Sequence, residues 1–184
     1  GLYPDQAAFD DRALGDGGDD DYDSEGGDDI MVSGPGIQRS EGMLGFDWVT
    51  HRGDPQPADA DLNFTGLLPP DIENIRDRFD LVEGLSGWQF NDTLRGDDGD
   101  ATTMAGHELN AAGIARITGL STLLPPGATS FTGGNIIIGG AGSDVIEGRG
   151  GDDILDGDAW LNVQLEAPVV GLVDSMTQLR TAVF

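Results

Sequence analysis

The feature that most constrains this chain is a nine-residue repeat in its C-terminal third. From Ser130 to Leu165, four consecutive nonapeptides keep one register and read SFTGGNIII, GGAGSDVIE, GRGGDDILD and GDAWLNVQL. The second unit matches every specified position of G-G-x-G-x-D-x-U-x, where U is a large apolar residue. Six residues of a unit make a glycine-rich turn and three make a short strand, so two units complete a coil of about 18 residues. The repeat predicts a mainly β fold, a short parallel β-roll.

The turns of this repeat present oxygen atoms to a shared centre. Glycine lets several backbone carbonyls point inward, and the sixth position adds a carboxylate or amide oxygen. Because turns on one edge are two units apart, we expect Asn135 and Asp153 to flank one ion. Asp144 and Asn162 are expected to flank another on the opposite edge. Ligand sets made only of oxygen select calcium. The candidate ligands of this block are Gly133, Asn135, Gly140, Gly142, Asp144, Gly151, Asp153, Asp158 and Asn162.

The same template fits an acidic block near the N-terminus, residues 15–38. Two units read GDGGDDDYD and SEGGDDIMV, and a decaying third unit follows them. Asp20 and Asp29 take the sixth position and are candidate ligands. Tyr22 and Met31 take the apolar eighth position, which predicts that both face the core.

A third block, residues 87–100, reads GWQFNDTLR and then GDDGDA. Asp92 stands in its sixth position and Leu94 in its eighth. Phe90 replaces the turn glycine, so whether this turn forms a regular ion site stays open. Asp92 and Asp97 are the candidate ligands here.

The charge balance restricts the partners of the chain. It has 34 acidic residues against nine basic ones, a formal net charge of -25, and no cysteine. Such a polyanion repels nucleic acid and anionic lipid, so neither nucleic acid binding nor membrane insertion is expected. Eight of the fourteen residues from Asp16 to Asp29 are acidic, and their glycine period distinguishes them from a disordered acidic tail. Cationic partners remain, above all calcium ions.

We interpret the chain as one calcium-binding module, residues 1–184, with two insertions between the repeat blocks. The insertions are residues 39–86 and 101–129, and a C-terminal segment spans 166–184. Apolar residues at three- and four-residue steps predict an amphipathic helix in PPDIENIRDRFDLVEGL, residues 69–85.

Three further elements are expected from local patterns. A second helix is predicted at His107–Ile117, where Gly119 is a plausible stop, and alternating apolar residues predict a strand at 161–165. A short last helix is expected at Asp174–Thr181. Within the first insertion, Phe46, Trp48 and Phe64 indicate a packed, ordered segment.

The segment HRGDPQPADADLNF, residues 51–64, carries oxygen side chains at alternating positions. Its D-x-D-x-N pattern resembles the opening of a helix-loop-helix calcium loop, without the expected glycine and final glutamate. A further irregular calcium site and a solvated polar loop both remain open. The candidate ligands are Asp54, Asp59, Asp61 and Asn63.

The nonapeptides resemble the repeats-in-toxin (RTX, hemolysin-type) family of calcium-binding modules, found in proteins exported by bacterial type I secretion. The segments GMLGFDWVTHRGDPQPADADLNF, IRDRFDLVEGLSGW and GDAWLNVQL also resemble the RTX region of very large bacterial proteins that carry an animal-type haem peroxidase domain. The resemblance implies calcium as the cofactor, several ions per module and an extracellular location. The peroxidase domain is far longer than this chain, so its activity does not carry over.

These observations lead to one functional hypothesis and two alternatives. The hypothesis is a secreted module that folds on binding extracellular calcium after export. The first alternative is an adhesion or interaction module, in which Trp48, Phe64 and Trp88 contact a polysaccharide or another domain of a larger parent protein. The remote alternative is calcium-triggered self-cleavage at Asp54-Pro55.

Enzymatic activity is not expected of these residues. The sequence has no H-E-x-x-H, G-x-S-x-G or P-loop motif, and its two histidines, His51 and His107, have ordinary structural explanations. No run of 18 apolar residues occurs, so a transmembrane helix is not expected. Gly1 to Asp10 lacks the pattern of an N-terminal signal peptide.

Overall fold

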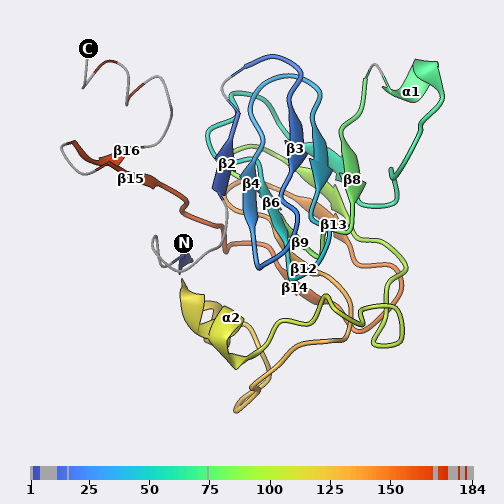
Figure 1. Ribbon diagram of the computed structural model, residues 1–184, viewed down its shortest axis with the longest axis vertical. Helices are drawn as coiled ribbons and strands as arrows, with labels where there is room; N and C mark the ends of the chain where they lie inside the picture. The colour runs from blue at the N-terminus through green and yellow to red at the C-terminus, as the bar shows by residue number, and fades with distance from the viewer. Residues whose placement is uncertain are drawn as a thin grey trace.

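The computed structural model describes residues 2–4, 12–15, 17–73, 75–167, 170–173, 178 and 181. Its strands are mostly three residues long and stack as successive coils, with parallel sheets on opposite sides (Figure 1). This confirms the mainly β fold of a parallel β-roll. The six-stranded sheet takes its strands in chain order: β2 (Arg12–Leu14), β4 (Ile30–Val32), β6 (Trp48–Thr50), β9 (Gly84–Ser86), β12 (Ile136–Ile138) and β14 (Ile154–Asp156).

The opposite side of the roll consists of two three-stranded parallel sheets, which we call the outer sheets. One contains β3 (Asp21–Asp23), β5 (Arg39–Glu41) and β8 (Arg78–Asp80). The other contains β7 (Asp59–Asp61), β10 (Thr93–Arg95) and β13 (Val145–Glu147). Each coil therefore contributes to both sides, as the nonapeptide period predicts.

The eighth residue of each unit fills the space between the sheets. In the six-stranded sheet Met31 pairs with Val49, and Val49 with Leu85, so equivalent side chains stack from coil to coil. Tyr22 and Met31 are buried, which confirms their predicted core positions. Because these middle side chains point inward, one apolar cluster joins both sides of the roll. It includes Tyr22, Met31, Val49, Phe79, Leu85, Leu94 and Ile137.

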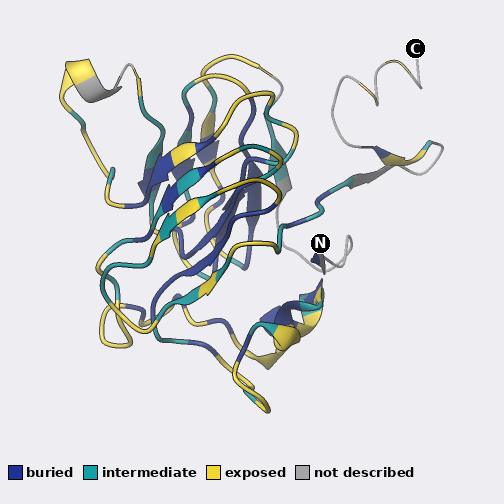
Figure 2. Ribbon diagram, turned by 180° about the vertical axis from the view of Figure 1, so that it is seen from behind, coloured by how far each residue is buried: buried dark blue, intermediate teal, exposed yellow. Residues whose placement is uncertain are grey.

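The other face of the six-stranded sheet is also buried. Its outward residues, such as Trp48 and Ile136, belong to a second apolar cluster that also contains Ile114 and Leu120. Figure 2 shows how much of the roll's backbone belongs to buried residues. Burial on both faces explains the continuous apolar strands Ile-Met-Val and Ile-Ile-Ile, which do not alternate with polar residues.

The covering layer comes from residues 101–131. It contains α2 (Ala111–Arg116), β11 (Ile117–Thr118) and the 3-10 helix η1 (Leu120–Thr122). The second predicted helix is thus confirmed, though shorter than His107–Ile117. The Asn110 side chain fixes its start by accepting hydrogen bonds from the backbone N–H groups of Ala112 and Gly113.

The predicted helix at residues 69–85 is wrong beyond its first turn. Among the described residues of this range, only α1 (Pro70–Glu73) is helical, and the chain then forms β8 and β9. Phe79 sits opposite Ser40 in the parallel register, and its backbone N–H donates to Phe64 O at 2.8 Å. Leu81 adopts a positive φ of 54° between the two strands, which no helix accommodates. Pairing with β5 outweighed local helix propensity.

Part of the expected insertion at residues 39–86 lies in the roll itself. It supplies β5, β6, β7, β8 and β9, and the unit GMLGFDWVT, residues 42–50, ends in β6. Its turn has glycine at the first and fourth positions and Asp47 at the sixth.

The chain ends are placed as follows within the described residues. Leu2 forms a parallel bridge with Leu161, and β1 (Tyr3–Pro4) pairs antiparallel with β11. The expected strand at 161–165 is reduced to this bridge and the first residue of β15 (Leu165–Ala167), which forms a hairpin with β16 (Gly171–Val173). Apart from residues 178 and 181, the helix expected at Asp174–Thr181 lies outside the described residues. No helix in the described ranges has the length and apolar character needed to cross a bilayer.

Candidate cation sites at the turn edges

The residues before β4, β6, β9, β12 and β14 carry oxygen side chains, which are linked by hydrogen bonds into what we call the first ladder. The Asp29 N–H donates to Asp47 Oδ1 at 2.9 Å, and the Asp47 N–H donates to Glu83 Oε2 at 2.9 Å. Further along, the Asn135 N–H donates to Asp153 Oδ1 at 2.8 Å. In each case the sixth-position side chain of one coil accepts a hydrogen bond from the backbone N–H of the sixth-position residue in the preceding coil. These bonds keep the turns of one edge in register.

A second ladder runs along the opposite edge. The Ala58 N–H donates to Asp92 Oδ1 at 2.8 Å, and the Asp92 N–H donates to Asp144 Oδ1 at 2.9 Å. The Gln38 N–H donates to Asp77 Oδ1 at 2.8 Å. Burial raises the pKa of Asp92 despite the N–H groups of Trp88 and Ala58, and the neighbouring Asp144 raises it further.

The first glycine of several units leaves a small space that we call a cradle. A Cβ on Gly139 would lie 2.5 Å from Asp144 Oδ2 and 2.8 Å from Gly157 O, in the next coil. A Cβ on Gly87 would likewise meet Asp92 Oδ2 and Gly139 O. The cradle therefore brings together a carboxylate oxygen of one turn and a carbonyl oxygen of the next.

The same arrangement recurs where the sixth residue is an amide. A Cβ on Gly96 would meet Asn135 Oδ1 and Gly148 O. A Cβ on Gly148 would meet Asp153 Oδ2. Side-chain and backbone oxygens thus converge repeatedly without a nitrogen or sulfur ligand, which is the donor set that calcium prefers.

Two buried carboxylate oxygens that face first-position glycines have no hydrogen-bond partner. Asp20 Oδ2 faces Gly15 and Asp47 Oδ2 faces Gly42, and both atoms are shielded from water. Burial raises the pKa of Asp47 to about 9, and the neighbouring Glu83, Asp29 and Asp28 raise it while the Asp29 N–H lowers it. An unpaired buried charge is costly, so a bound cation fits this donor set.

Among the described residues, no three side chains of His, Cys, Asp or Glu are grouped to hold a metal ion by themselves. Backbone carbonyls and amide oxygens add to the carboxylates at these edges, as the spaces beside Gly139 and Gly96 show. Calcium accepts such mixed carbonyl and carboxylate shells of six to eight oxygens.

Residues 129–159 match a family model described as the RTX calcium-binding nonapeptide repeat, in four copies. This chain carries RTX calcium-binding repeats. The match covers the Gly139 and Gly148 turns and the residues Asn135, Asp144 and Asp153. No curated protein and no solved structure matched the chain. The matched repeat is a calcium-binding structural repeat, and the comparison therefore supports calcium binding by residues 129–159.

The structure brings one of the two expected ligand pairs together. Asn135 and Asp153 are neighbours on one edge through their hydrogen bond. Asp144 instead neighbours Asp92. Asn162 leaves the roll: its Oδ1 accepts from Arg52 Nε at 3.0 Å, and its N–H donates to Leu2 O. The chain end turns away because Leu161 pairs with Leu2 rather than starting another coil.

The candidate glycines stand in tight turns against neighbouring coils. Gly140, Gly142 and Gly151 have positive φ angles of 102°, 142° and 89°. A Cβ on Gly140 would meet Trp88 O, and one on Gly151 would meet Gly133 O. Asp158 is exposed, and its N–H donates to Asp156 Oδ1 at 2.9 Å.

The four candidate ligands of residues 51–64 are held by separate partners. Asp61 forms two bonds to Arg149, at 2.6 and 2.7 Å, and Asp59 pairs with Arg95 and Arg76. Asp54 Oδ1 accepts from the Gln56 N–H, and Asn63 is exposed. Burial raises the pKa of Asp61, but the hydrogen bonds from Arg149 and from the Asn63 N–H, together with the charges of Arg149 and Arg95, outweigh this and hold the pKa below the ordinary value.

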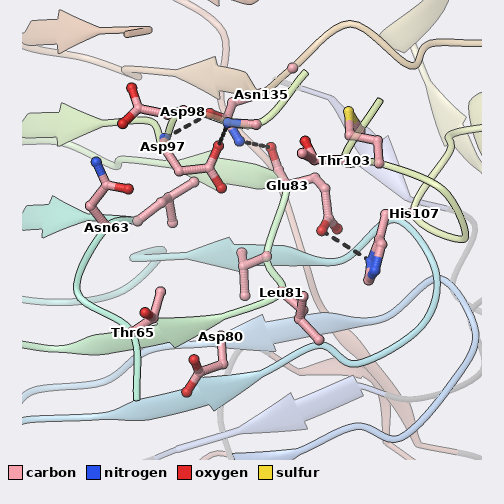
Figure 3. Close-up of a pocket in the computed structure, with 15 residues that line it drawn as sticks. Asn63, Thr65, Asp80, Leu81, Glu83, Asp97, Asp98, Thr103, His107 and Asn135 are labelled. Atoms are coloured by element: carbon pink, nitrogen blue, oxygen red, sulfur yellow. Dashed lines mark hydrogen bonds and ion pairs between the residues drawn. The ribbon is translucent and has the colours of Figure 1, made fainter. Parts of the chain in front are cut away.

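A pocket of about 420 Å³ lies beside the first ladder (Figure 3). Asn63, Asp97 and Asn135 line it together with Glu83 and His107. The Asp97 N–H donates to Asn135 Oδ1 at 2.9 Å, and Glu83 Oε1 lies 3.3 Å from His107 Nδ1. Pairing with Glu83 raises the pKa of His107, while burial raises that of Glu83.

Sequence reasoning missed two sixth-position residues, Asp47 and Glu83. The signal for Asp47 was the G-x-x-G-x-D pattern in GMLGFDWVT, which aromatic residues and methionine obscure. The sequence pattern left the role of Trp48 open. Its side chain is fully buried in the core, and Trp88 packs edge-on against Trp160 with ring centroids 4.6 Å apart. Burial of Trp48 supports a core role over a binding patch.

Proposed function

We propose that this chain is a calcium-switched folding module of an exported bacterial protein, unfolded or loosely compact without calcium and folded as the β-roll with it. The observation that carries the proposal is the cradle of the RTX repeats, where Asp144 Oδ2 and Gly157 O converge on the space left by Gly139. Such a space suits a hard cation better than a side chain.

The switch follows from where the ligands stand in the sequence. Partners in the ladders are 18, 36 and 52 residues apart, so the unfolded chain cannot hold them together. Ions that bind only the folded chain stabilise it by about 1.4 to 2.7 kcal/mol each at calcium concentrations 10 to 100 times the Kd. They also offset the repulsion within a net charge of -25.

The cellular role combines this switch with the resemblance to type I exported proteins. Low calcium inside the cell keeps the segment unfolded for passage through a narrow channel, and higher calcium outside folds it after exit. Extracellular calcium modules have Kd values of about 10⁻⁴ to 10⁻³ M, which places the transition between the two compartments.

A calcium titration followed by circular dichroism tests the switch. In EDTA we expect the spectrum of a largely unfolded chain, and with millimolar calcium a cooperative gain of β signal. A spectrum that calcium does not change would overturn the proposal.

A pair of glycine variants tests the cradle itself. Gly139→Ala places a methyl group 2.5 Å from Asp144 Oδ2, so we expect a higher calcium midpoint and one ion fewer at saturation. Gly17→Ala is the matched control, because its nearest neighbour, Pro35 O, lies 3.9 Å from the added Cβ. Equal behaviour of the two variants would show that the cradle does not hold calcium.

A further inference from the structure

The turn of the unit GMLGFDWVT, which lies outside residues 129–159, contains a buried carboxylate, Asp47, with one unpartnered oxygen. Asp47 is 0 % exposed, and its Oδ1 accepts the Asp29 N–H at 2.9 Å. Its Oδ2 has no hydrogen-bond partner. The neighbouring acids differ: Glu83 has His107 at 3.3 Å, and Asp28 has Arg116 at 3.3 Å. In the described part of the chain no arginine or histidine pairs with Asp47.

The unpartnered oxygen faces a cradle. A Cβ on Gly42 would lie 2.6 Å from Asp47 Oδ2 and would also meet Leu81 O. These are the same three elements as at Gly139: a first-position glycine, a sixth-position carboxylate and a carbonyl from the next coil.

The carbonyl oxygen, Leu81 O, comes from an unusually short turn. Residues 81–83 are all that separates β8 from β9, whereas a nonapeptide turn has six residues. Leu81 reaches the position through its positive φ of 54°, a conformation that costs energy for a leucine. The Gly42 N–H donates to Asp80 O at 2.9 Å and holds the two turns together.

We infer that Asp47 Oδ2 and Leu81 O are ligands of an additional calcium site, in which a three-residue turn takes the place of one nonapeptide turn. The site rests on the proposed function, since it assumes that the cradles of this roll bind calcium. It extends calcium binding into a segment that the repeat match does not cover, and it gives the Asp47 charge a counter-ion.

The competing explanation is that Asp47 stays protonated and binds nothing. Asp47→Asn separates the two, because asparagine keeps the shape and the acceptor of a protonated acid but loses the charge. We expect this variant to bind one calcium ion fewer than the wild type at saturation, counted by native mass spectrometry of the full chain. An unchanged count would overturn the site.

Asp144→Asn, within the matched repeats, distinguishes failure of the site from failure of the proposed function. If Asp144→Asn loses an ion and Asp47→Asn does not, only the inference of an additional site is rejected. If neither variant loses an ion, the proposed calcium-binding function is rejected.

A crystal structure of the wild-type chain grown with calcium covers the case in which Asp47→Asn does not fold. We expect an ion about 2.3 to 2.6 Å from both Asp47 Oδ2 and Leu81 O. Calcium at Asp144 with water or no ion beside Asp47 would reject the inference.

Discussion

Two buried aspartates at strand ends, Asp61 and Asp47, differ in how their carboxylate charges are neutralised. Asp61, at the end of β7, holds the guanidinium of Arg149 through two hydrogen bonds, and Arg149 also donates to Gly96 O at 2.8 Å. Asp47, just before β6, faces a glycine cradle and no cation in the described structure. One charge is neutralised by the chain, and the other requires an ion or a proton.

The difference extends to the two sides of the roll. Five of the nine arginines stand on or beside the outer sheets, where they pair with acids and carbonyls that range from exposed Asp59 to buried Asp61. They are Arg39, Arg76, Arg78, Arg95 and Arg149. The first ladder instead stacks Asp29, Asp47 and Glu83 in the interior. The outer sheets therefore carry their own counter-ions, and we expect calcium dependence to reside at the cradles.

Removing Arg149 should have the largest effect on this comparison. Arg149→Ala leaves Asp61 buried without its cation, which costs roughly 3 kcal/mol for a buried pair. We expect the free energy of unfolding of the calcium-loaded protein, measured by urea denaturation, to fall by that amount. The number of bound ions should stay unchanged, in contrast to Asp47→Asn.

The double variant Arg149→Ala with Asp61→Asn is the control. Removing the lone charge should restore much of the lost stability, because the two side chains act as one unit. If Arg149→Ala instead bound an extra calcium ion at Asp61, the two edges would be interchangeable and the distinction would fail.

The sequence predicted which positions of the repeat face the core, but not where individual coils and side-chain pairs differ from the repeat. The nonapeptide period places Met31 and Tyr22 in the core correctly, because each coil repeats the same inward position. Leu155 has the same position but is 48 % exposed, since it lies in the last coil. The partner of Asp61 is 88 residues away, and no local pattern links it to Arg149.

The pH dependence of the calcium-free chain sharpens the comparison. The pKa of Asp47 rises from 3.8 to about 9 on folding, so folding takes up a proton between these values and is favoured as pH falls. Burial raises the pKa of Asp77 to about 6, which acts in the same direction at lower pH. The lowered pKa of Asp61 keeps it charged from pH 7 to 9, so it contributes nothing there.

We therefore expect the folded fraction in EDTA to increase as pH falls from 9 to 7, by up to about 1.4 kcal/mol per pH unit for each proton taken up. Circular dichroism in EDTA measures this, and saturating calcium should flatten the dependence. The window stops at pH 7 because burial lowers the pKa of His51 from 6.5 to about 4, which favours unfolding at lower pH. A folded fraction that falls between pH 9 and 7 would contradict the assignment of Asp47.

The smallest effect is expected where an acid and an arginine meet in water. Asp21, on β3, pairs with Arg39 at 3.1 Å, but its side chain is 65 % exposed. Exposed pairs contribute little because water and salt screen them and both side chains lose freedom. Asp21→Asn should change the free energy of unfolding in urea by less than about 1 kcal/mol and leave the ion count unchanged. A loss as large as that of Arg149→Ala would mean that sheet position, rather than burial, determines how much an arginine stabilises the outer sheets.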